Sequence, residues 1–239
     1  MTASDGPAGA PAAPHDPVGH VVWDWNGTLL DDARVVIAAT TAAFAQAGID
    51  AAVSQEIYRL NFTRPIRIFY ERLLGRPIDP EEWVRLDHAF HEEYHRHADG
   101  CRLTAGALEA LEVVRARGWT QSLCSMLPER YLLPAVAAHR IGGYFLRIDG
   151  LTGGERGGTK MRHLKAHVAA LGTAPARAVM IGDTVDDAVA AAGAGLDCVL
   201  LDGGGGLHTS EALAEAGVPV VATLAEAMGL LLPPVAPAP

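Results

Sequence analysis

Short apolar runs alternate with amphipathic, helix-like segments along most of the chain. Strands are expected over Val21–Trp23, Trp119–Ser125, Ala178–Ile181, Cys198–Leu201 and Val218–Val221. Helices are expected from Asp32, a good N-cap, to Gly48, and over Ala107–Arg117, residues 160–171 and Asp187–Ala192. Alternating strands and helices are typical of a parallel sheet with helices on both faces. The pattern therefore predicts a Rossmann-like α/β core, in which ligands bind beyond the carboxyl ends of the strands.

One long segment, residues 36–104, departs from this alternation and is predicted to be helical throughout. Amphipathic stretches cover residues 54–74 and 80–98, with a Gly-Arg-Pro break between them. An all-helical insertion after the first strand predicts an α-helical cap domain, carried by a core made of residues 18–35 and 105–230. Clefts between two such modules commonly hold small molecules.

Both ends of the chain have compositions that are typical of disordered tails. Residues 1–17 contain five Ala, four Pro and two Gly, with no Lys, no Arg and no apolar run, so they are not expected to form a secretory signal. Residues 231–239, LLPPVAPAP, are expected to be flexible in the same way. No apolar run approaches the ~18 residues that a membrane span needs, so no membrane association is expected.

The composition of the 239 residues predicts a folded protein in a reducing compartment. Hydrophobic residues make up 49 % and charged residues 20 %, which excludes a disordered polymer. The formal net charge is −9 and no basic stripe is visible, so a nucleic-acid partner is not expected. The three cysteines, Cys101, Cys124 and Cys198, form no close pair and have no metal-ligand spacing, which predicts reduced thiols and a cytoplasmic location.

Polar side chains follow the expected strands at the points where those strands end. Asp24 follows the first strand, Ser125 ends the Trp119 strand, and Asp183 and Asp187 follow the Ala178 strand. Lys160 opens a helix after a Gly-rich stretch, and it is one of only two lysines among 19 basic residues. In a parallel sheet, all of these positions converge on one edge.

The residue types at this edge suit phosphoryl transfer. A carboxylate acts as a nucleophile that forms a covalent intermediate. Two or three carboxylates with a backbone carbonyl make an oxygen-only site that suits Mg²⁺. A hydroxyl and an ammonium group hold and neutralise a phosphoryl group. The set therefore predicts phosphoryl transfer through an aspartyl-phosphate, with Mg²⁺ and the ammonium group balancing the charge.

The order and spacing of these residues resemble those of the haloacid dehalogenase-like hydrolases, in the branch with a helical cap between the first and second motifs. The matching segments are DWNGTLLDD at residues 24–32, the strand that ends at Ser125, Lys160, and IGDTVDD at residues 181–187. The resemblance covers about residues 20–225. The first motif, together with GGGGLHTS at residues 203–210, is most similar to bacterial phosphoglycolate-phosphatase-like proteins, which implies phosphoglycolate as a candidate substrate.

The resemblance implies a Mg²⁺-dependent phosphatase that acts on a small phosphorylated metabolite, and it implies a role for each matching residue. Asp24 is implied as the nucleophile. The ligands of Mg²⁺ would be Asp24, Asp183 and the backbone carbonyl of Asn26. Ser125 and Lys160 would bind the phosphoryl group. Asp24, Asn26, Ser125 and Lys160 are therefore the candidate catalytic positions.

Further candidates would support the site or recognise the substrate. Asp187 is implied as a support for Lys160 or for the metal. Thr28 is either a local cap or a contact of the site. Arg64 and Arg67 flank a proline in the predicted cap, and they are either surface charges or ligands of an anionic substrate group.

A cluster of histidines occupies the second half of the predicted cap. His88, His91 and His95 share one helix face because they lie at i, i+3 and i+7, and His97 follows. Such a face either binds a metal ion or is solvated. The Glu-rich surroundings favour the second interpretation.

Asn26 departs from the family pattern at a catalytic position. The family's phosphatases carry a second Asp two residues after the nucleophile, which protonates the leaving group and then activates water. An amide exchanges no proton near neutral pH, and general acid–base assistance is typically worth ~10²–10⁴-fold. Asp31, Asp186 or a histidine of the cap is a candidate substitute. The alternative hypothesis is a catalytically impaired protein that binds or senses a phosphometabolite.

Two other classes of protein share part of this residue set. A phosphorelay receiver also combines Asp, a hydroxyl and Lys after successive strands, but receivers are much shorter, keep their acidic pair at the first strand and have no place for a cap. A carbon–halogen hydrolase also uses an Asp nucleophile but needs no metal, so the acidic residues of IGDTVDD argue against it. For the oligomeric state, the pattern leaves both a monomer and a homodimer open.

Overall fold

The computed structural model describes residues 19–152, 159–172, 178–203 and 206–232. The tails expected over residues 1–17 and most of residues 231–239 lie outside this part of the chain, and so does the Gly-rich stretch over residues 153–158. Among the described residues, no helix is both long enough and apolar enough to cross a membrane.

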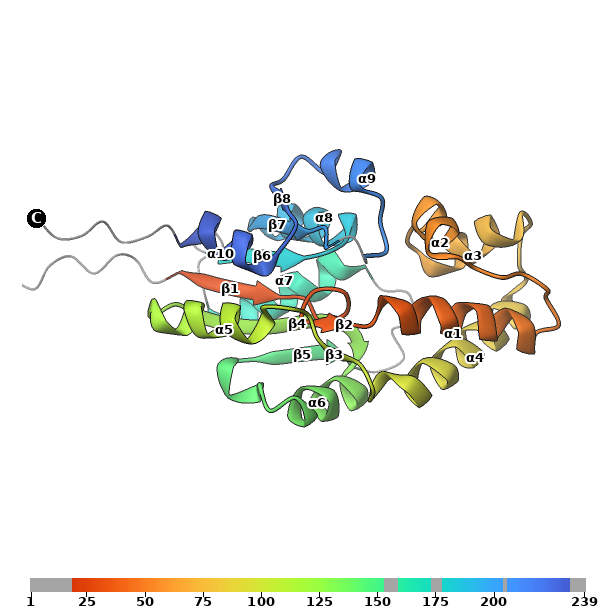
Figure 1. Cartoon of the computed structure of the whole chain (residues 1–239), viewed down its shortest axis with the longest axis horizontal. Helices are drawn as coiled ribbons and strands as arrows, with labels where there is room; N and C mark the ends of the chain where they lie inside the picture. Colours follow the sequence, from red (N-terminus) through yellow and green to blue (C-terminus); the bar gives the residue numbers. More distant parts are fainter. Residues whose placement is uncertain (1–18, 153–158, 173–177, 204–205, 233–239) are drawn as a thin grey trace, which may run out of the picture.

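Within the described residues, six parallel strands form a central sheet in the order β5-β4-β1-β6-β7-β8 (Figure 1). The strands are β1 (His20–Trp23), β4 (Thr120–Pro128), β5 (Ile148–Leu151), β6 (Ala178–Gly182), β7 (Asp197–Leu201) and β8 (Val220–Val221). β1 lies between β4 and β6, with Trp23 aligned with Leu123 on one side and with Ile181 on the other. All residues of β1 are buried, as expected for a central strand that is covered on both faces. The predicted Rossmann-like core is confirmed.

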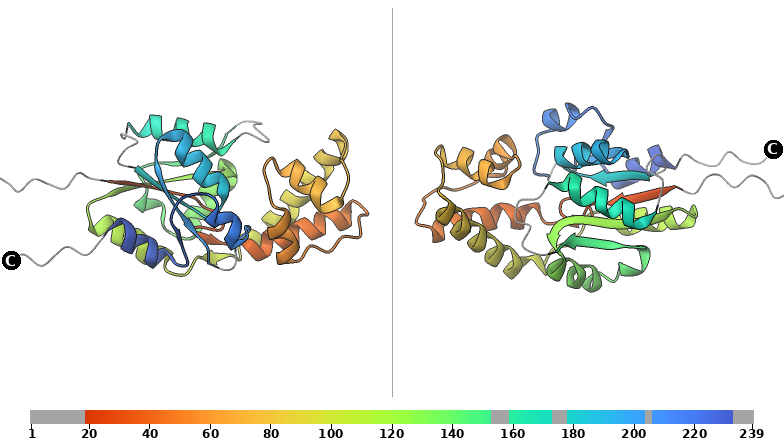
Figure 2. Two further views of the ribbon diagram at one scale, coloured as in Figure 1. Left: turned by 90° about the horizontal axis from the view of Figure 1, so that it is seen from above. Right: turned by 180° about the vertical axis from the view of Figure 1, so that it is seen from behind.

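Helices cover both faces of this sheet (Figure 2). One face is covered by α5 (Ala107–Ala116), α6 (Glu129–Ala138) and α10 (Leu224–Leu231), and the short helix η1 (Gly142–Tyr144) lies beside them. The other face is covered by α7 (Lys160–Leu171), α8 (Val185–Ala194) and α9 (Ser210–Ala214). Val21 and Trp23 join the first apolar cluster and Val22 joins the second, because successive side chains of a strand point to opposite faces.

The chain leaves the sheet after β1 and forms a separate helical layer before it returns. The layer contains α1 (Ala33–Gln46), α2 (Gln55–Asn61), α3 (Ile66–Leu74) and α4 (Pro80–Ala98). These helices pack around their own apolar cluster, which includes Phe44, Phe69 and Leu86. They lie at the end of the sheet toward which β1 points (Figures 1 and 2). The cap boundaries expected at residues 36 and 104 stay predictions.

An antiparallel pair of short strands joins the segment in which the chain leaves the sheet to the segment in which it returns. β2 (Leu30–Asp31) pairs with β3 (Arg102–Leu103). Residues 102–103 are therefore a strand and not part of a helix, which corrects the expectation of an all-helical segment. Their pairing partner lies about 70 residues earlier in the chain, and local periodicity does not show such a contact.

Other element boundaries also differ from the expected ones. The stretch 54–74 divides into α2 and α3 around Pro65, which cannot donate the backbone hydrogen bond of a continuous helix. The strand expected to end at Ser125 continues to Pro128. α6 has no counterpart among the expected elements because Pro134 lies inside it, and β5 is a short edge strand. The helix over residues 160–171 has the predicted bounds.

Candidate active site

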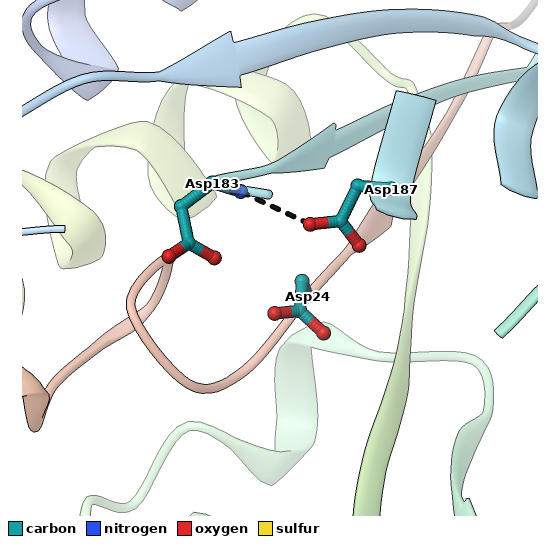
Figure 3. A group of neighbouring side chains, drawn as sticks. All are labelled: Asp24, Asp183 and Asp187. Atoms are coloured by element: carbon teal, nitrogen blue, oxygen red, sulfur yellow. Dashed lines mark hydrogen bonds between the residues drawn. The ribbon is translucent and has the colours of Figure 1, made fainter. Parts of the chain in front are cut away.

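Three aspartates meet at the carboxyl end of the sheet. One carboxylate oxygen from each of Asp24, Asp183 and Asp187 lies within 4.8 Å of the others (Figure 3). The three residues are 6 %, 2 % and 0 % exposed. β1 and β6 are neighbours, and the backbone N–H of Asp24 extends their pairing by donating to Ile181 at 2.9 Å. The predicted convergence of these residues at one sheet edge is therefore present.

Asp187 is held by the start of α8. Its Oδ2 accepts hydrogen bonds from the backbone N–H of Asp183 at 3.2 Å and from the backbone and hydroxyl of Thr184 at 3.0 and 2.7 Å. Together with Thr184 it forms a capping box. Burial opposes the charged form, but Lys160 and the donors from Thr184 outweigh burial, so the pKa of Asp187 is lowered. Asp187 is therefore an anchored, ionised partner for Lys160.

Lys160 begins α7 and is buried beside two of the aspartates. Its ammonium group forms ion pairs with Asp24 and with Asp187. Burial disfavours the ammonium ion, but the charges of Asp187 and Asp24 outweigh that effect and raise the pKa of Lys160. This lysine therefore supplies a permanent positive charge next to Asp24.

Asp24, Asp183 and Asp187 place three carboxyl groups beside the single positive charge of Lys160. Burial raises the pKa of Asp24 to about 6, with Lys160 opposing the shift. Burial and the charges of Asp187 and Asp24 raise the pKa of Asp183 well above its usual range. Such a crowded acidic group favours a bound cation, because the cation removes the repulsion between the carboxylates.

The loop after β1 brings its backbone against Asp183. Gly27 has φ +75°, and a Cβ at this position would lie 2.1 Å from Oδ2 of Asp183. The hydroxyl of Thr28 donates to Oδ1 of Asp183 at 3.2 Å. Thr28 is therefore a contact of the acidic cluster, and glycine is required at residue 27 for both its conformation and its lack of a side chain.

These residues fit a hard divalent cation. Oδ2 of Asp183 is buried and has no hydrogen-bond partner among the described residues. Carboxylate oxygens are the donors that Mg²⁺ prefers. Asp24 and Asp183 are the residues that would hold the ion, whereas Asp187 is engaged by Lys160 and Thr184. The backbone carbonyl of Asn26 stays the predicted third ligand.

Ser125 is buried in the interior of β4, and not at its end as expected. The backbone N–H of Leu127 donates to its Oγ at 3.1 Å. The parallel register between β4 and β5 shifts between Cys124 and Pro128, so regular pairing stops beside Ser125. β4 follows β1 in register, with Leu123 beside Trp23, and Ser125 therefore lies at the same level of the sheet as the residues after β1.

Asn26 is bound by two residues that the sequence did not single out for the site. Its Nδ2 donates to Asp32 and to the hydroxyl of Tyr94, both at 2.7 Å. Asp32 does lie at the predicted N-cap of α1, but its side chain makes no capping hydrogen bond there. Tyr94 comes from α4, 68 residues away, and no local pattern in the sequence predicts its position.

The two candidate arginines have different surroundings. Nε of Arg64 lies 2.7 Å from Asp186, the residue before Asp187. Arg67 is bound by Glu71 at 3.2 Å and by the carbonyl of Ile78 at 2.5 Å, both in the helical layer. Arg64 therefore reaches the sheet edge, whereas Arg67 stabilises its own layer.

A further contact joins the helical layer to the sheet. Arg59 on α2 donates to the carbonyl of His208 at 2.5 Å and lies 3.5 Å from Asp202. The ring of Phe62 packs edge-on against His208 with 4.9 Å between centroids. These contacts hold the helical layer against the loop that follows β7.

The residues expected to substitute for the missing acid at residue 26 lie in different parts of the structure. Asp31 is exposed on β2, and Asp186 pairs with Arg64. His91 and His95 are partly buried with stacked rings 5.9 Å apart, and His95 packs on Tyr131. Among the described residues, Asp24, Asp183 and Asp187 are close enough together to share a metal ion. The described histidines of the helical layer form no such group.

Known proteins resemble most of the chain and not only its motifs. A family model described as haloacid dehalogenase-like hydrolase matches residues 18–195. The phosphoglycolate phosphatase of Caulobacter vibrioides is 30 % identical over 205 residues, which cover 84 % of this chain and 85 % of that protein. Phosphoglycolate phosphatase 1 of Pseudomonas aeruginosa is 28 % identical over 196 residues, which cover 76 % of this chain and 68 % of that protein.

Solved structures share the fold. The crystal structure of a predicted phosphatase from Clostridium acetobutylicum matches with a TM-score of 0.78. Its sequence is 18 % identical, and the match covers 91 % of this chain and 99 % of that one. The same arrangement of sheet and inserted helices is therefore kept at low sequence identity.

Proposed function

The chain belongs to the haloacid dehalogenase-like hydrolases, and from that premise we propose that it is a Mg²⁺-dependent phosphatase acting on a small phosphorylated metabolite through an aspartyl-phosphate. One observation carries the proposal, namely that Asp24, Asp183 and Lys160 gather in one buried cluster. This cluster combines a nucleophile, oxygen ligands for a cation and a fixed positive charge, which are the parts that phosphoryl transfer requires.

In the proposed reaction, Asp24 is the nucleophile of the first step and the leaving group of the second. Its carboxylate oxygen first attacks phosphorus, the bond from phosphorus to the leaving oxygen breaks, and the leaving group departs with the electron pair. Lys160, already paired with Asp24, holds the transferred phosphoryl oxygens, and Ser125 donates a hydrogen bond to them. Water then attacks phosphorus, so that inorganic phosphate leaves and the Asp24 carboxylate is restored. Mg²⁺, when bound, supplies Lewis-acid stabilisation of the phosphoryl charge.

Two observations guide the choice of substrate. The names of the two relatives make phosphoglycolate the first compound to test. Arg64 supports a substrate with a second anionic group, because a guanidinium that already binds the Asp186 carboxylate can exchange it for a carboxylate of the ligand. The helical layer that carries Arg64 would then exclude water and select the substrate.

Two further proposals concern the cellular location and the oligomeric state of the protein. The described cysteines are free thiols, and Cys124 and Cys198 are buried, which supports a cytoplasmic location. Every proposed site residue comes from a single chain, so a monomer and a homodimer would both be active.

The test is a screen of phosphomonoesters, including phosphoglycolate, with and without Mg²⁺. We expect phosphate release that needs Mg²⁺ and is lost in Asp24→Asn, because the amide is not a nucleophile. Arg64→Met should raise KM for phosphoglycolate more than for a substrate without a carboxylate. Release that survives Asp24→Asn would refute the proposed nucleophile.

A second candidate function follows from Asn26 alone. A protein without an acid–base group at this position would take up a phosphoryl group and release it slowly, and it would then act as a phosphometabolite-binding or regulatory protein. Single-turnover accumulation of an acid-stable phosphoenzyme without phosphate release would favour this function. Multiple turnovers with stoichiometric phosphate release would exclude it.

A further inference from the structure

The amide nitrogen of Asn26 is hydrogen-bonded within the protein. It donates to Oδ2 of Asp32 at 2.7 Å. The same nitrogen also donates to the hydroxyl of Tyr94, at 2.7 Å. Tyr94 in turn donates its hydroxyl proton to Oδ2 of Asp32 at 2.7 Å, and the N–H of Gly27 donates to Oδ1 at 3.0 Å. Asn26, Tyr94 and the backbone of Gly27 are therefore all hydrogen-bonded around the Asp32 carboxyl group.

Burial keeps this network in place. Asp32 is 2 % exposed and Tyr94 is 3 % exposed. Turning the Asn26 amide toward a substrate would leave the buried Asp32 carboxylate and the Tyr94 hydroxyl short of a donor, which costs the desolvation free energy of those groups. The orientation of Asn26 is therefore set by its neighbours and not by the ligand.

This geometry decides how a leaving group can depart. At the position where the family's phosphatases carry an acid, Asn26 has an amide that exchanges no proton near neutral pH, and its nitrogen is already bonded to Asp32 and Tyr94. Its Oδ1 is only an acceptor. An oxygen that leaves phosphorus gains negative charge, and it receives no stabilisation from this residue. Leaving groups that are stable as anions tolerate that lack, whereas alkoxides depend on protonation.

We propose that the enzyme selects acyl and aryl phosphates over alkyl phosphate monoesters. This inference rests on the phosphatase function proposed above and narrows its substrate class, and it places phosphoglycolate among the slow substrates. Asp24 forms a bond to phosphorus, the bond between phosphorus and the leaving oxygen breaks, and the electron pair stays on that oxygen. The carboxylate or phenolate leaves as an anion, and a phenolate takes its proton from bulk water afterwards.

The test is a leaving-group series with the intact chain and saturating Mg²⁺. The substrates are acetyl phosphate, phenyl phosphates substituted at the para position, and benzyl phosphate, which carries the same ring on one additional methylene and leaves as an alkoxide. The readout is kcat/KM, because it covers the steps up to transfer onto Asp24. We expect kcat/KM to fall steeply with leaving-group basicity, with benzyl phosphate at least ~10²-fold below phenyl phosphate.

The outcomes separate this inference from the proposed function. A flat series, with benzyl phosphate cleaved as fast as phenyl phosphate, would overturn the inference and leave the phosphatase standing, because another group would then be protonating the leaving oxygen. Absence of Mg²⁺-dependent cleavage of every compound would overturn the proposed function and the inference with it.

Exchanging the two side chains tests the residues themselves. Asn26→Asp alone would place two carboxylates at hydrogen-bond distance, so it is combined with Asp32→Asn, which keeps a donor and an acceptor between the two positions. We expect the ratio of kcat/KM for benzyl phosphate to that for phenyl phosphate to rise by ~10²–10⁴-fold in this double variant.

The matched control is Asp32→Asn alone, which disturbs the network but adds no acid at residue 26, and we expect no rise in the ratio. An unchanged ratio in a folded double variant would overturn the inference. If the double variant does not fold, the leaving-group series measured with the unmodified protein is enough to test the inference.

Discussion

Gly27 and Asp183 lie so close together that the backbone of one determines the position of the other's carboxylate. A Cβ on Gly27 would come 2.1 Å from Oδ2 of Asp183. Thr28, the next residue, donates to Oδ1 of the same carboxylate. Oδ2 itself has no hydrogen-bond partner within the described chain. The loop after β1 therefore holds one oxygen of Asp183 and leaves the other available to a cation.

Gly27→Ala should separate this contact from ordinary backbone strain. Gly48 is a matched control, because its φ of +73° is close to the +75° of Gly27 and an added Cβ there meets nothing within 4 Å. Both variants should lose about 1–2 kcal/mol of unfolding free energy from the left-handed conformation, and Gly27→Ala should lose more because its Cβ overlaps the Asp183 carboxylate. Only Gly27→Ala should also weaken Mg²⁺ activation, by roughly 10–100-fold. Equal Mg²⁺ titration curves for the two variants would contradict the proposed metal site.

Lys160→Met should damage both stability and activity. The substitution leaves Asp24 and Asp187 buried without their cation, and breaking a buried pair in this way typically costs about 3–5 kcal/mol. Lys165→Met on the same helix is the matched control, because Lys165 is exposed, and we expect little change there. Urea unfolding and phosphate release measure the two effects. Similar losses in both variants would show that helix α7, and not the ion pairs, is what Lys160 supports.

Much of the site was predictable because it depends on the topology of a parallel sheet. Asp24, Asp183 and Lys160 each lie at the junction between two elements, and a parallel sheet brings such junctions to one edge whatever the loops do. The position of Ser125 was less predictable, because β4 continues past it with a shifted register. A register shift depends on the neighbouring strand and leaves no period in the sequence.

The surroundings of Asn26 were not predictable from local pattern. Asp32 has the residue type and position of a helix N-cap, yet its carboxylate binds Asn26 and Gly27 because a buried amide and a backbone N–H compete for it. Tyr94 reaches the same carboxylate only because α4 packs along α1. Contacts of this kind follow from how the two layers meet, which periodicity within either layer does not specify.

Tyr94→Phe should weaken the connection between the helical layer and the loop after β1. Removing the hydroxyl deprives the buried Asp32 carboxyl group of a donor, and leaving a buried polar group short of a hydrogen bond typically costs about 1–3 kcal/mol. Tyr58→Phe is a suitable comparison, because Tyr58 is a buried tyrosine that packs among Phe62 and Phe69 of the same layer. The free energy of unfolding should fall more for Tyr94→Phe. Equal values would mean that the network around Asp32 adds nothing to stability.

Acid should destabilise the protein through a chain of buried and partly buried polar groups. His20 bonds Thr120 at 2.7 Å and Ser122 at 2.8 Å, and Ser122 bonds His167, which contacts Asp149. Ser122, His167 and Asp149 have the order of a hydrolytic triad, but Ser122 is fully buried, so no substrate reaches it. Burial and the nearby His167 lower the pKa of His20 from 6.5 to about 4. Burial also lowers the pKa of His167, with Asp149 opposing the shift.

The sign of the pH dependence follows from the lowered pKa. The folded state keeps His20 neutral, so its contribution is fully present above pH 6.5 and is lost as the pH falls toward 4, by about 3 kcal/mol from His20. Urea unfolding between pH 7.5 and pH 4.5 should show this loss, and His20→Gln should reduce its slope while lowering stability at pH 7.5. An unchanged slope in that variant would assign the acid sensitivity to other groups.

The most direct test of the account is to find which residue carries the phosphoryl group. The protein is mixed with an aryl phosphate and Mg²⁺, quenched in acid within one turnover, digested and examined by mass spectrometry. We predict one phosphoryl group on the peptide that contains Asp24, and none in Asp24→Asn. A phosphoryl group on any other residue, or turnover by Asp24→Asn at the rate of the natural chain, would contradict the central claim.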